Sequence, residues 1–110
     1  MKISVIIYSN DDETIWNGFR FGVTSLIYDN ETTVFLLGKG VEALSENSLY
    51  DIQEQVDLFR ENGGTLIGCG VCVESRKDEM PNLEELLSCN LGSMQDLYKL
   101  VIEADKVLTF

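Results

Sequence analysis

The sequence predicts one α/β domain, a three-layer sandwich in which helices cover both faces of a mainly parallel sheet. Short apolar segments rich in β-branched residues alternate with amphipathic segments of helical period, which is the pattern of βαβ units. Hydrophobic residues make up 45% of the 110 residues and charged residues 25%, as in an ordinary globular protein. Because no repeat, linker or low-complexity segment divides the chain, we expect residues 1–110 to form a single domain.

An expected strand and an expected helix open the chain. Residues 2–8 are mostly apolar and β-branched, which is typical of a strand buried on both faces. Residues 9–12 are rich in helix N-cap types, and the helix that they open is expected to continue to about residue 29. Its buried face has helical spacing and is expected to contain Ile15, Trp16, Phe19, Val23, Leu26 and Ile27. Phe21 and Tyr28 lie on the opposite side, so we expect them to contact a second copy of the chain or a neighbouring loop.

A second strand and a second helix follow. Residues 32–37 form the expected strand, and the helix is expected over about residues 49–62. Its buried face has amphipathic spacing and is expected to contain Leu49, Ile52, Val56 and Phe59. Gly63 and Gly64 end this helix, because glycine readily adopts the left-handed conformation that is common just past a helix.

Two further helices and a closing strand are expected in the last third of the chain. Asn82 with Glu85 resembles a capping box that opens a short helix, and Ser93 with Asp96 resembles another that opens the last helix. The buried side of the last helix is expected to contain Leu97, Leu100, Val101 and Ala104. Residues 106–110 form the closing strand.

The alternation of strands and helices also predicts where a site would lie. With residues 65–69 as the third strand and helices on both faces, we expect the strand order 2-1-3-4. In that order the sheet reverses between the first and third strands, and ligands of open α/β sheets bind at such a reversal, beyond the carboxyl ends. The segments expected there are residues 9–13 and 69–72.

The acidic composition limits the classes of partner. The formal net charge is −11, so DNA, RNA and anionic membranes would be repelled on average. The absence of histidine excludes a Ser-His-Asp triad and any histidine-ligated metal. No apolar segment approaches the roughly 20 residues of a membrane span, and the run at residues 2–8 is too short for a signal peptide. We therefore expect a cytoplasmic protein that binds neither nucleic acid nor membranes.

The strongest chemical signal is the C-x-x-C motif at residues 69–72, which places two thiols at the end of the third strand. The thiols could simply pack in the core, because cysteine is small and often buried. They could form a redox dithiol, but Pro81 follows too closely to supply the opposing proline of a thioredoxin-like site. They could bind a metal, but the only other thiol is Cys89, so a four-sulfur site would need another subunit.

The fourth interpretation is a nucleophilic thiolate that carries a group. The pKa of a thiol falls near backbone N–H groups and cations, and the thiolate is the reactive form. Gly70 lets the backbone approach the sulfur closely, and Arg76 adds positive charge nearby. Ser9 and Asn10 are expected at the same edge of the sheet. The candidate catalytic residues are Cys69 and Cys72, and the candidate supporting residues are Gly70, Arg76, Ser9 and Asn10.

Three segments, in their order and spacing, resemble one family. Residues 34–41 match a second strand and its glycine-valine turn, residues 63–72 with Arg76 match a cysteine strand and the basic residue after it, and residues 93–110 match a last helix and strand. In these segments the chain resembles the DsrE/DsrF-like family of small sulfur-relay proteins, which includes the YchN type. It departs from the pattern at Lys39, where many members have aspartate.

The resemblance implies a flavodoxin-like sheet and a homo-oligomer, either a trimer or a hexamer. It also implies that Cys69 accepts sulfur as a persulfide and passes it on, with Cys72 matching a second cysteine of some relatives. We therefore expect a sulfur-handling protein, a sulfurtransferase or a sulfur carrier, that needs no cofactor and meets protein donors and acceptors of sulfur. The alternatives are an oligomeric module that binds a small ligand or metal without turnover, and a purely structural oligomer.

Overall fold

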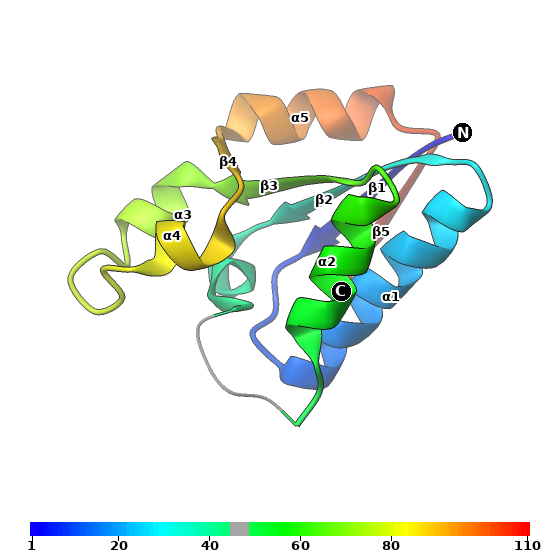
Figure 1. The fold of residues 1–110 in the computed structure, drawn as a ribbon. Helices are drawn as coiled ribbons and strands as arrows, with labels where there is room; N and C mark the ends of the chain where they lie inside the picture. Colours follow the sequence, from blue (N-terminus) through cyan, green and yellow to red (C-terminus); the bar gives the residue numbers. More distant parts are fainter. Residues whose placement is uncertain (45–48) are drawn as a thin grey trace.

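Five strands form a single sheet in the structure, a computed structural model that describes residues 1–44 and 49–110 (Figure 1). Each strand is parallel to its neighbours. From one edge to the other, the order is β4 (Asn90–Gly92), β3 (Thr65–Cys69), β2 (Glu31–Leu36), β1 (Lys2–Ile7) and β5 (Lys106–Thr109). The predicted α/β class with a parallel sheet is confirmed.

The order of the strands differs from the predicted one. The sequence predicts the second strand outside the first, but β2 lies between β1 and β3, and β5 occupies the other side of β1. The short strand β4, which is not predicted, pairs with β3. The connections from β1 to β2, from β2 to β3 and from β3 to β4 each move one strand further in the same direction across the sheet. The connection from β4 to β5, which contains α5 (Met94–Glu103), returns across the sheet to the far side of β1. The order therefore reverses between β1 and β5, away from the strand that carries the thiols.

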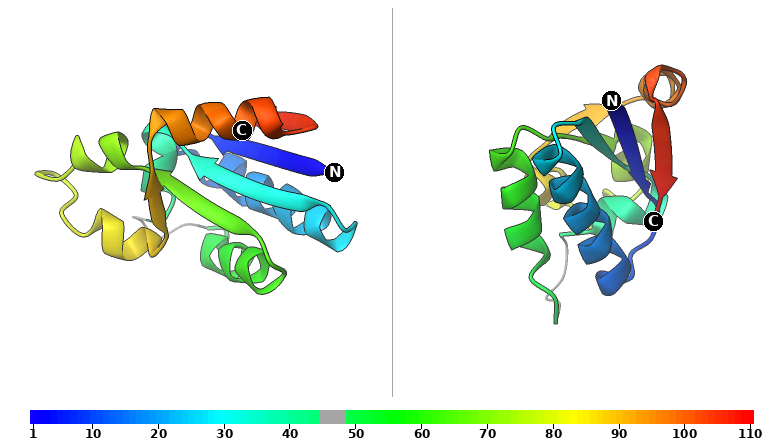
Figure 2. Two further views of the ribbon diagram at one scale, coloured as in Figure 1. Left: turned by 90° about the horizontal axis from the view of Figure 1, so that it is seen from above. Right: turned by 90° about the vertical axis from the view of Figure 1, so that its right-hand side faces the viewer.

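Helices cover both faces of the sheet, as predicted. In Figure 1, α1 (Asp12–Ile27) and α2 (Ile52–Glu61) lie side by side below the sheet, and α5 runs above it; Figure 2 gives two further views. Because parallel crossovers are right-handed, two steps in the same direction place their helices on the same face. The predicted order requires the first two helices to lie on opposite faces, and for this reason it is wrong.

Aromatic rings form the centre of the core between the sheet and the helices α1 and α2. Phe19 of α1 and Phe59 of α2 pack edge to face, with 5.9 Å between their ring centroids, and both side chains are fully buried. A methyl group on Gly64 would collide with the ring of Phe59, so glycine is required where the chain enters β3. This packing fixes the start of β3 and thus the direction in which its other end points.

The second helix is shorter than predicted. It begins at Ile52, after the side chain of Asp51 accepts a hydrogen bond from the N–H of Glu54 at 3.0 Å. Leu49, predicted on the buried face, is fully exposed, because it precedes this cap and lies outside the helix. The first helix also ends earlier than predicted, at Ile27, whose side chain is largely exposed rather than buried.

One of the two predicted capping boxes forms and the other does not. At the start of α5, the N–H of Ser93 donates to Asp96 Oδ2 at 2.7 Å, and the N–H of Asp96 donates to Ser93 Oγ at 3.2 Å. Asn82 precedes the short helix α4 (Leu83–Leu87) without a capping hydrogen bond from its side chain. Its φ of −96° and ψ of 10° are not the extended conformation that an N-cap residue needs.

Apolar and aromatic side chains near α1 and along α5 are among those that remain exposed. On α1, Phe21 packs against Phe110 of the same chain, with 6.1 Å between ring centroids, whereas Tyr28, directly after the helix, is 76% exposed. The outer surface of α5 exposes four apolar or aromatic side chains, Met94, Tyr98, Val101 and Ile102. Val101 was predicted on the buried side, but α5 turns mainly Leu97 toward the sheet. No helix within residues 1–44 and 49–110 is long and apolar enough to cross a bilayer.

Candidate functional site

Two short helical turns meet beyond the carboxyl ends of β2 and β3. β2 leads into the 3₁₀ helix η1 (Gly38–Glu42), β3 leads into the helix α3 (Gly70–Glu74), and the two turns pack against each other. Parallel strands bring their carboxyl ends to the same edge of a sheet, so the adjacency of β2 and β3 creates this contact. We call residues 69–72 the thiol turn; it contains the end of β3 and the start of α3.

Cys69 is the buried thiol of the turn. Its side chain is 5% exposed, and its Sγ accepts a hydrogen bond from the N–H of Cys72 at 3.4 Å. Burial raises the pKa of the Cys69 thiol, and a hydrogen bond with the side chain of Cys72 raises the pKa further, while backbone N–H groups oppose the shift. The expected lowering of a thiol pKa is therefore not found at Cys69, because loss of hydration outweighs the amides.

Cys72 is more accessible and faces a different amide. Its side chain is partly exposed, and its Sγ accepts a hydrogen bond from the N–H of Gly38 at 3.2 Å. This donor comes from η1, on the neighbouring strand connection. The sulfur of Cys72 therefore faces a backbone N–H group from outside its own turn.

The loop that carries this amide is held in place by the backbone of β1. The N–H of Leu37 donates to the carbonyl oxygen of Ile7 at 2.9 Å. Gly38 has a φ of +56°, a conformation that glycine adopts without strain. Gly40 is packed so closely on the Ile7 carbonyl that a methyl group would collide with it. The Gly38 amide is therefore positioned independently of the thiols.

An ion pair fastens the two turns together. Arg76 Nε donates to Glu42 Oε2 at 2.7 Å, and Arg76 Nη1 donates to the carbonyl oxygen of Cys72 at 3.1 Å. The two charged side chains are only 22% and 18% exposed. Asn10 Nδ2 donates to Glu42 Oε1 at 3.4 Å. The hydrogen bond from Arg76 lowers the pKa of Glu42, so this carboxylate is ionised at neutral pH.

The hydrogen bonds connect four of the six predicted site residues, Cys69, Cys72, Arg76 and Asn10. Ser9 is directed elsewhere, because its Oγ accepts the N–H of Asp11 at 3.0 Å at the start of α1. At Gly70 an added methyl group would make only an ordinary contact, 3.5 Å from the carbonyl oxygen of Gly92. The amides directed at Cys69 belong to Val71 and Cys72 rather than to Gly70.

Gly38 and Glu42 also belong to the site, although they were not predicted as site residues. The available signal was the glycine-rich turn directly after the second strand, at the edge where the thiols were expected. Assigning this turn to the site required the correct strand order, because only the observed adjacency of β2 and β3 places η1 beside α3. Within residues 1–44 and 49–110, no cluster of three or more cysteine or carboxylate side chains is arranged to hold a metal ion.

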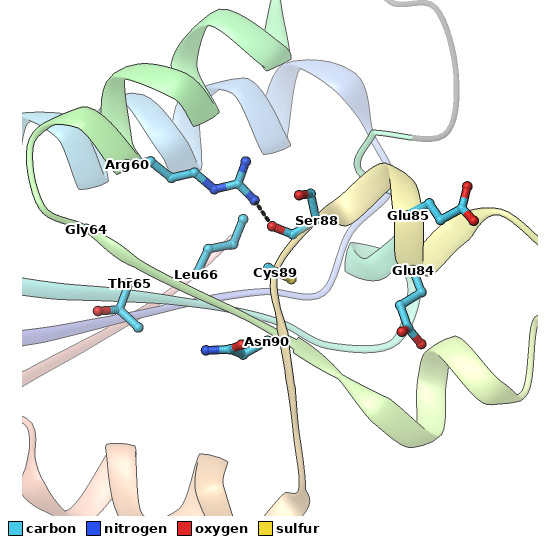
Figure 3. A pocket seen from close by; sticks show the side chains of 9 residues that line it. All are labelled: Arg60, Gly64, Thr65, Leu66, Glu84, Glu85, Ser88, Cys89 and Asn90. Atoms are coloured by element: carbon cyan, nitrogen blue, oxygen red, sulfur yellow. Dashed lines mark hydrogen bonds between the residues drawn. The ribbon is translucent and has the colours of Figure 1, made fainter.

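The third cysteine lies in a separate open hollow of about 620 Å³ (Figure 3). The residues that line it are Arg60, Gly64, Thr65, Leu66, Glu84, Glu85, Ser88, Cys89 and Asn90. Arg60 Nη2 donates to the carbonyl oxygens of Leu87 and Ser88, at 2.7 and 2.8 Å. Burial raises the pKa of Cys89, and the positive charge of Arg60 partly offsets this increase. The hollow lies along the start of β3, and neither thiol of the thiol turn lines it.

Comparisons with known proteins agree with this architecture. The profile of the DsrE/DsrF-like family matches residues 1–110. The uncharacterised protein MJ0989 of Methanocaldococcus jannaschii is 32% identical over 116 residues, covering 100% of both chains. The uncharacterised protein MK0008 of Methanopyrus kandleri is 26% identical over 102 residues, covering 89% of this chain and 83% of the relative.

Solved structures also share the fold. The ychN protein of E. coli has a TM-score of 0.78 at 20% identity and covers 100% of both chains. BT1422 of Bacteroides thetaiotaomicron, a conserved protein of unknown function, has a TM-score of 0.79 at 16% identity, covering 99% of this chain and 94% of the other. Identities this low show a common architecture, and the chemistry of this chain follows from its own residues.

Proposed function

This chain belongs to the DsrE/DsrF-like family, and on that premise we propose that its thiol turn binds sulfane sulfur as a cysteine persulfide and passes it on. Membership of the family supports a protein of the sulfur-relay type. The finer proposal depends on one observation: two neighbouring thiols lie at the carboxyl edge of the sheet, where Cys72 Sγ accepts the N–H of Gly38 at 3.2 Å and Cys69 Sγ accepts the N–H of Cys72 at 3.4 Å. This arrangement supports an anionic sulfur that can attack a donor.

Transfer at such a pair consists of two balanced displacements. A thiolate of the pair attacks the outer sulfur of a donor persulfide, a new S–S bond forms, the S–S bond of the donor breaks, and the donor leaves as a thiolate. An acceptor thiolate then takes the same sulfur and restores the thiolate of the pair. Neither step needs a cofactor or an external oxidant. The family likeness favours Cys69 as the first acceptor, with Cys72 resolving the persulfide or accepting the sulfur next.

Sulfur loading measured by intact mass tests this function. After incubation with a low-molecular-mass persulfide, we expect the protein to gain the mass of sulfur, and a thiol reductant to remove it. A Cys69→Ser/Cys72→Ser double variant should lose the gain although Cys89 is still present, and the matched Cys89→Ser variant should keep it. Equal gains in the double variant and the wild type would disprove the function. A stoichiometric metal held by the pair, without sulfur uptake, would favour the alternative binding module.

We also propose that the chain forms a homo-oligomer, with the outer surface of α5 as the contact. Met94, Tyr98 and Ile102 are each at least 60% exposed there, an apolar surface that a second copy would bury. On α1, by contrast, Phe21 is already covered by Phe110. Tyr98→Glu should lower the mass measured by sedimentation, and the matched Tyr28→Glu should not. A wild-type mass that stays monomeric at every concentration would contradict the proposal.

A further inference from the structure

We propose that Cys72 is the thiol that attacks the donor sulfur first, with Cys69 as its buried hydrogen-bond partner, an inference that rests on the proposed sulfur-carrying function of the same turn. The family likeness favours the opposite order. The geometry around the two sulfur atoms differs in three respects, which are accessibility, the donor that faces each sulfur, and the attachment of the turn to η1.

Accessibility separates the two thiols. An attacking sulfur must approach the donor along the axis of the S–S bond that breaks, so its surface must be open to a second molecule. Cys69 is 5% exposed at the end of β3, whereas Cys72, within α3, is partly exposed. Cys72 therefore offers a donor the more accessible thiol of the two.

The hydrogen bonds give the two sulfur atoms different tasks. Cys72 Sγ receives the N–H of Gly38 from outside the turn, at 3.2 Å. Cys69 Sγ receives the N–H of Cys72 from within the turn, at 3.4 Å, and thereby caps α3. Burial raises the pKa of the Cys69 thiol, and the neighbouring side chain of Cys72 raises it further, so Cys69 keeps its proton at neutral pH. The sulfur that faces an amide from outside the turn is that of Cys72.

Glu42 and Arg76 are positioning residues for this contact. Arg76 joins the carbonyl oxygen of Cys72 at 3.1 Å to the carboxylate of Glu42 at 2.7 Å. Glu42 ends the same 3₁₀ helix that Gly38 begins. The ion pair thus closes a ring from Cys72 through Arg76 and η1 back to the amide that faces the sulfur. Loosening the pair lets α3 move away from η1 and weakens the hydrogen bond to Cys72 without touching the sulfur itself.

The first step then has defined products. The Cys72 thiolate attacks the outer sulfur of a donor persulfide, R–S–SH, forms the S–S bond of a Cys72 persulfide, and releases R–S⁻; the proton on the outer sulfur remains there. Cys69 exchanges no electrons in this step. Its thiol keeps its proton throughout.

Limited alkylation of the folded wild-type protein tests the order. Cleavage after Arg60 and Arg76 leaves both thiols of the turn in one peptide, in which fragment ions distinguish Cys69 from Cys72, and Cys89 falls in another peptide. Because Cys69 is 5% exposed and Cys72 is partly exposed, and because burial raises the pKa of Cys69, we expect early iodoacetamide label on Cys72 to exceed that on Cys69 several-fold. Earlier or equal labelling of Cys69 would overturn the order.

Single variants connect the order to sulfur uptake. Cys69→Ala should still gain sulfur from a low-molecular-mass persulfide, mapped to Cys72, whereas Cys72→Ala should load several-fold more slowly because its remaining thiol in the turn is buried. Circular dichroism establishes that each variant is folded, and the wild-type labelling needs no variant. Label on Cys72 without any sulfur gain would refute the carrier function and leave the order standing. Sulfur gained first on Cys69 would refute the order and leave the function standing.

Discussion

The thiol turn and the hollow beside α2 both hold cysteine, but they surround the sulfur differently. In the thiol turn the sulfur of Cys69 accepts the N–H of Cys72, and the partly exposed sulfur of Cys72 accepts the N–H of Gly38 from a loop fixed on β1. In the hollow, burial dominates the environment of Cys89, and the nearby Arg60 donates to carbonyl oxygens. The hollow therefore lies beside the single thiol rather than beside the pair.

The largest effect is expected where the backbone of η1 meets β1. Gly40→Ala would drive a methyl group into the carbonyl oxygen of Ile7, so we expect a loss of stability of about 3 kcal/mol and much slower labelling of Cys72. In Gly70→Ala the new methyl group makes an ordinary contact of 3.5 Å with Gly92, so stability should stay equal or rise by up to about 1 kcal/mol. Urea unfolding measures both variants. Equal stability of the two would show that η1 is not fixed by this contact.

A smaller effect is expected from the ion pair that ties η1 to α3. Glu42→Gln removes a charge that accepts from Arg76 at 2.7 Å in a partly buried setting, at a cost of about 1–2 kcal/mol. Because the hydrogen bond from Gly38 weakens, the alkylation profile of Cys72 should shift to higher pH. The matched control is Glu74→Gln, which removes an exposed charge 3.9 Å from Lys77 and should change neither quantity. A profile that is unchanged in Glu42→Gln would remove Glu42 from the positioning role.

The same pair predicts a pH dependence of stability. The folded-state pKa of Glu42 lies below its ordinary value of 4.5. A group whose pKa is lowered by folding contributes stability that is present above the unfolded value and is lost as the pH falls through the folded value. The difference in unfolding free energy between wild type and Glu42→Gln should therefore be full near neutral pH and shrink below pH 4.5. A difference that grows on acidification would contradict the ion pair.

Local signals in the sequence predicted most elements, while long-range packing decided their order. The apolar runs and helical stripes predicted the class, and the Ser93–Asp96 capping box formed because both partners lie within one turn. The position of β2 could not be predicted in this way, since it depends on which face of the sheet α1 and α2 share. That choice is made by contacts distant in sequence, such as the packing of Phe19 on Phe59.

The sequence predicted the two thiols of the candidate site but not all of the residues that surround them. Cys69 and Cys72 stand out by spacing, and their place at a strand end follows from the apolar run before them. Gly38 and Glu42 precede Cys72 by more than a helix and a strand, so no local pattern connects them to it. Arg76 illustrates the difference: its charge was expected to act on the thiols, but the folded chain directs it to Glu42 and a carbonyl oxygen.

The smallest effect is expected in the hollow, where it tests whether the two cysteine regions are independent. Arg60→Met keeps the aliphatic stem but loses the hydrogen bonds to the carbonyl oxygens of Leu87 and Ser88, at a cost of about 1 kcal/mol because the site is open to water. The charge of Arg60 also lowers the pKa of Cys89, so alkylation of Cys89 should become slower in this variant. Labelling of Cys72 should stay at the wild-type rate, since distant sites with no shared partner behave additively. A matching slowdown at Cys72 would mean that α4 and β4 transmit the change to the thiol turn, and the two regions would then have to be treated as one site.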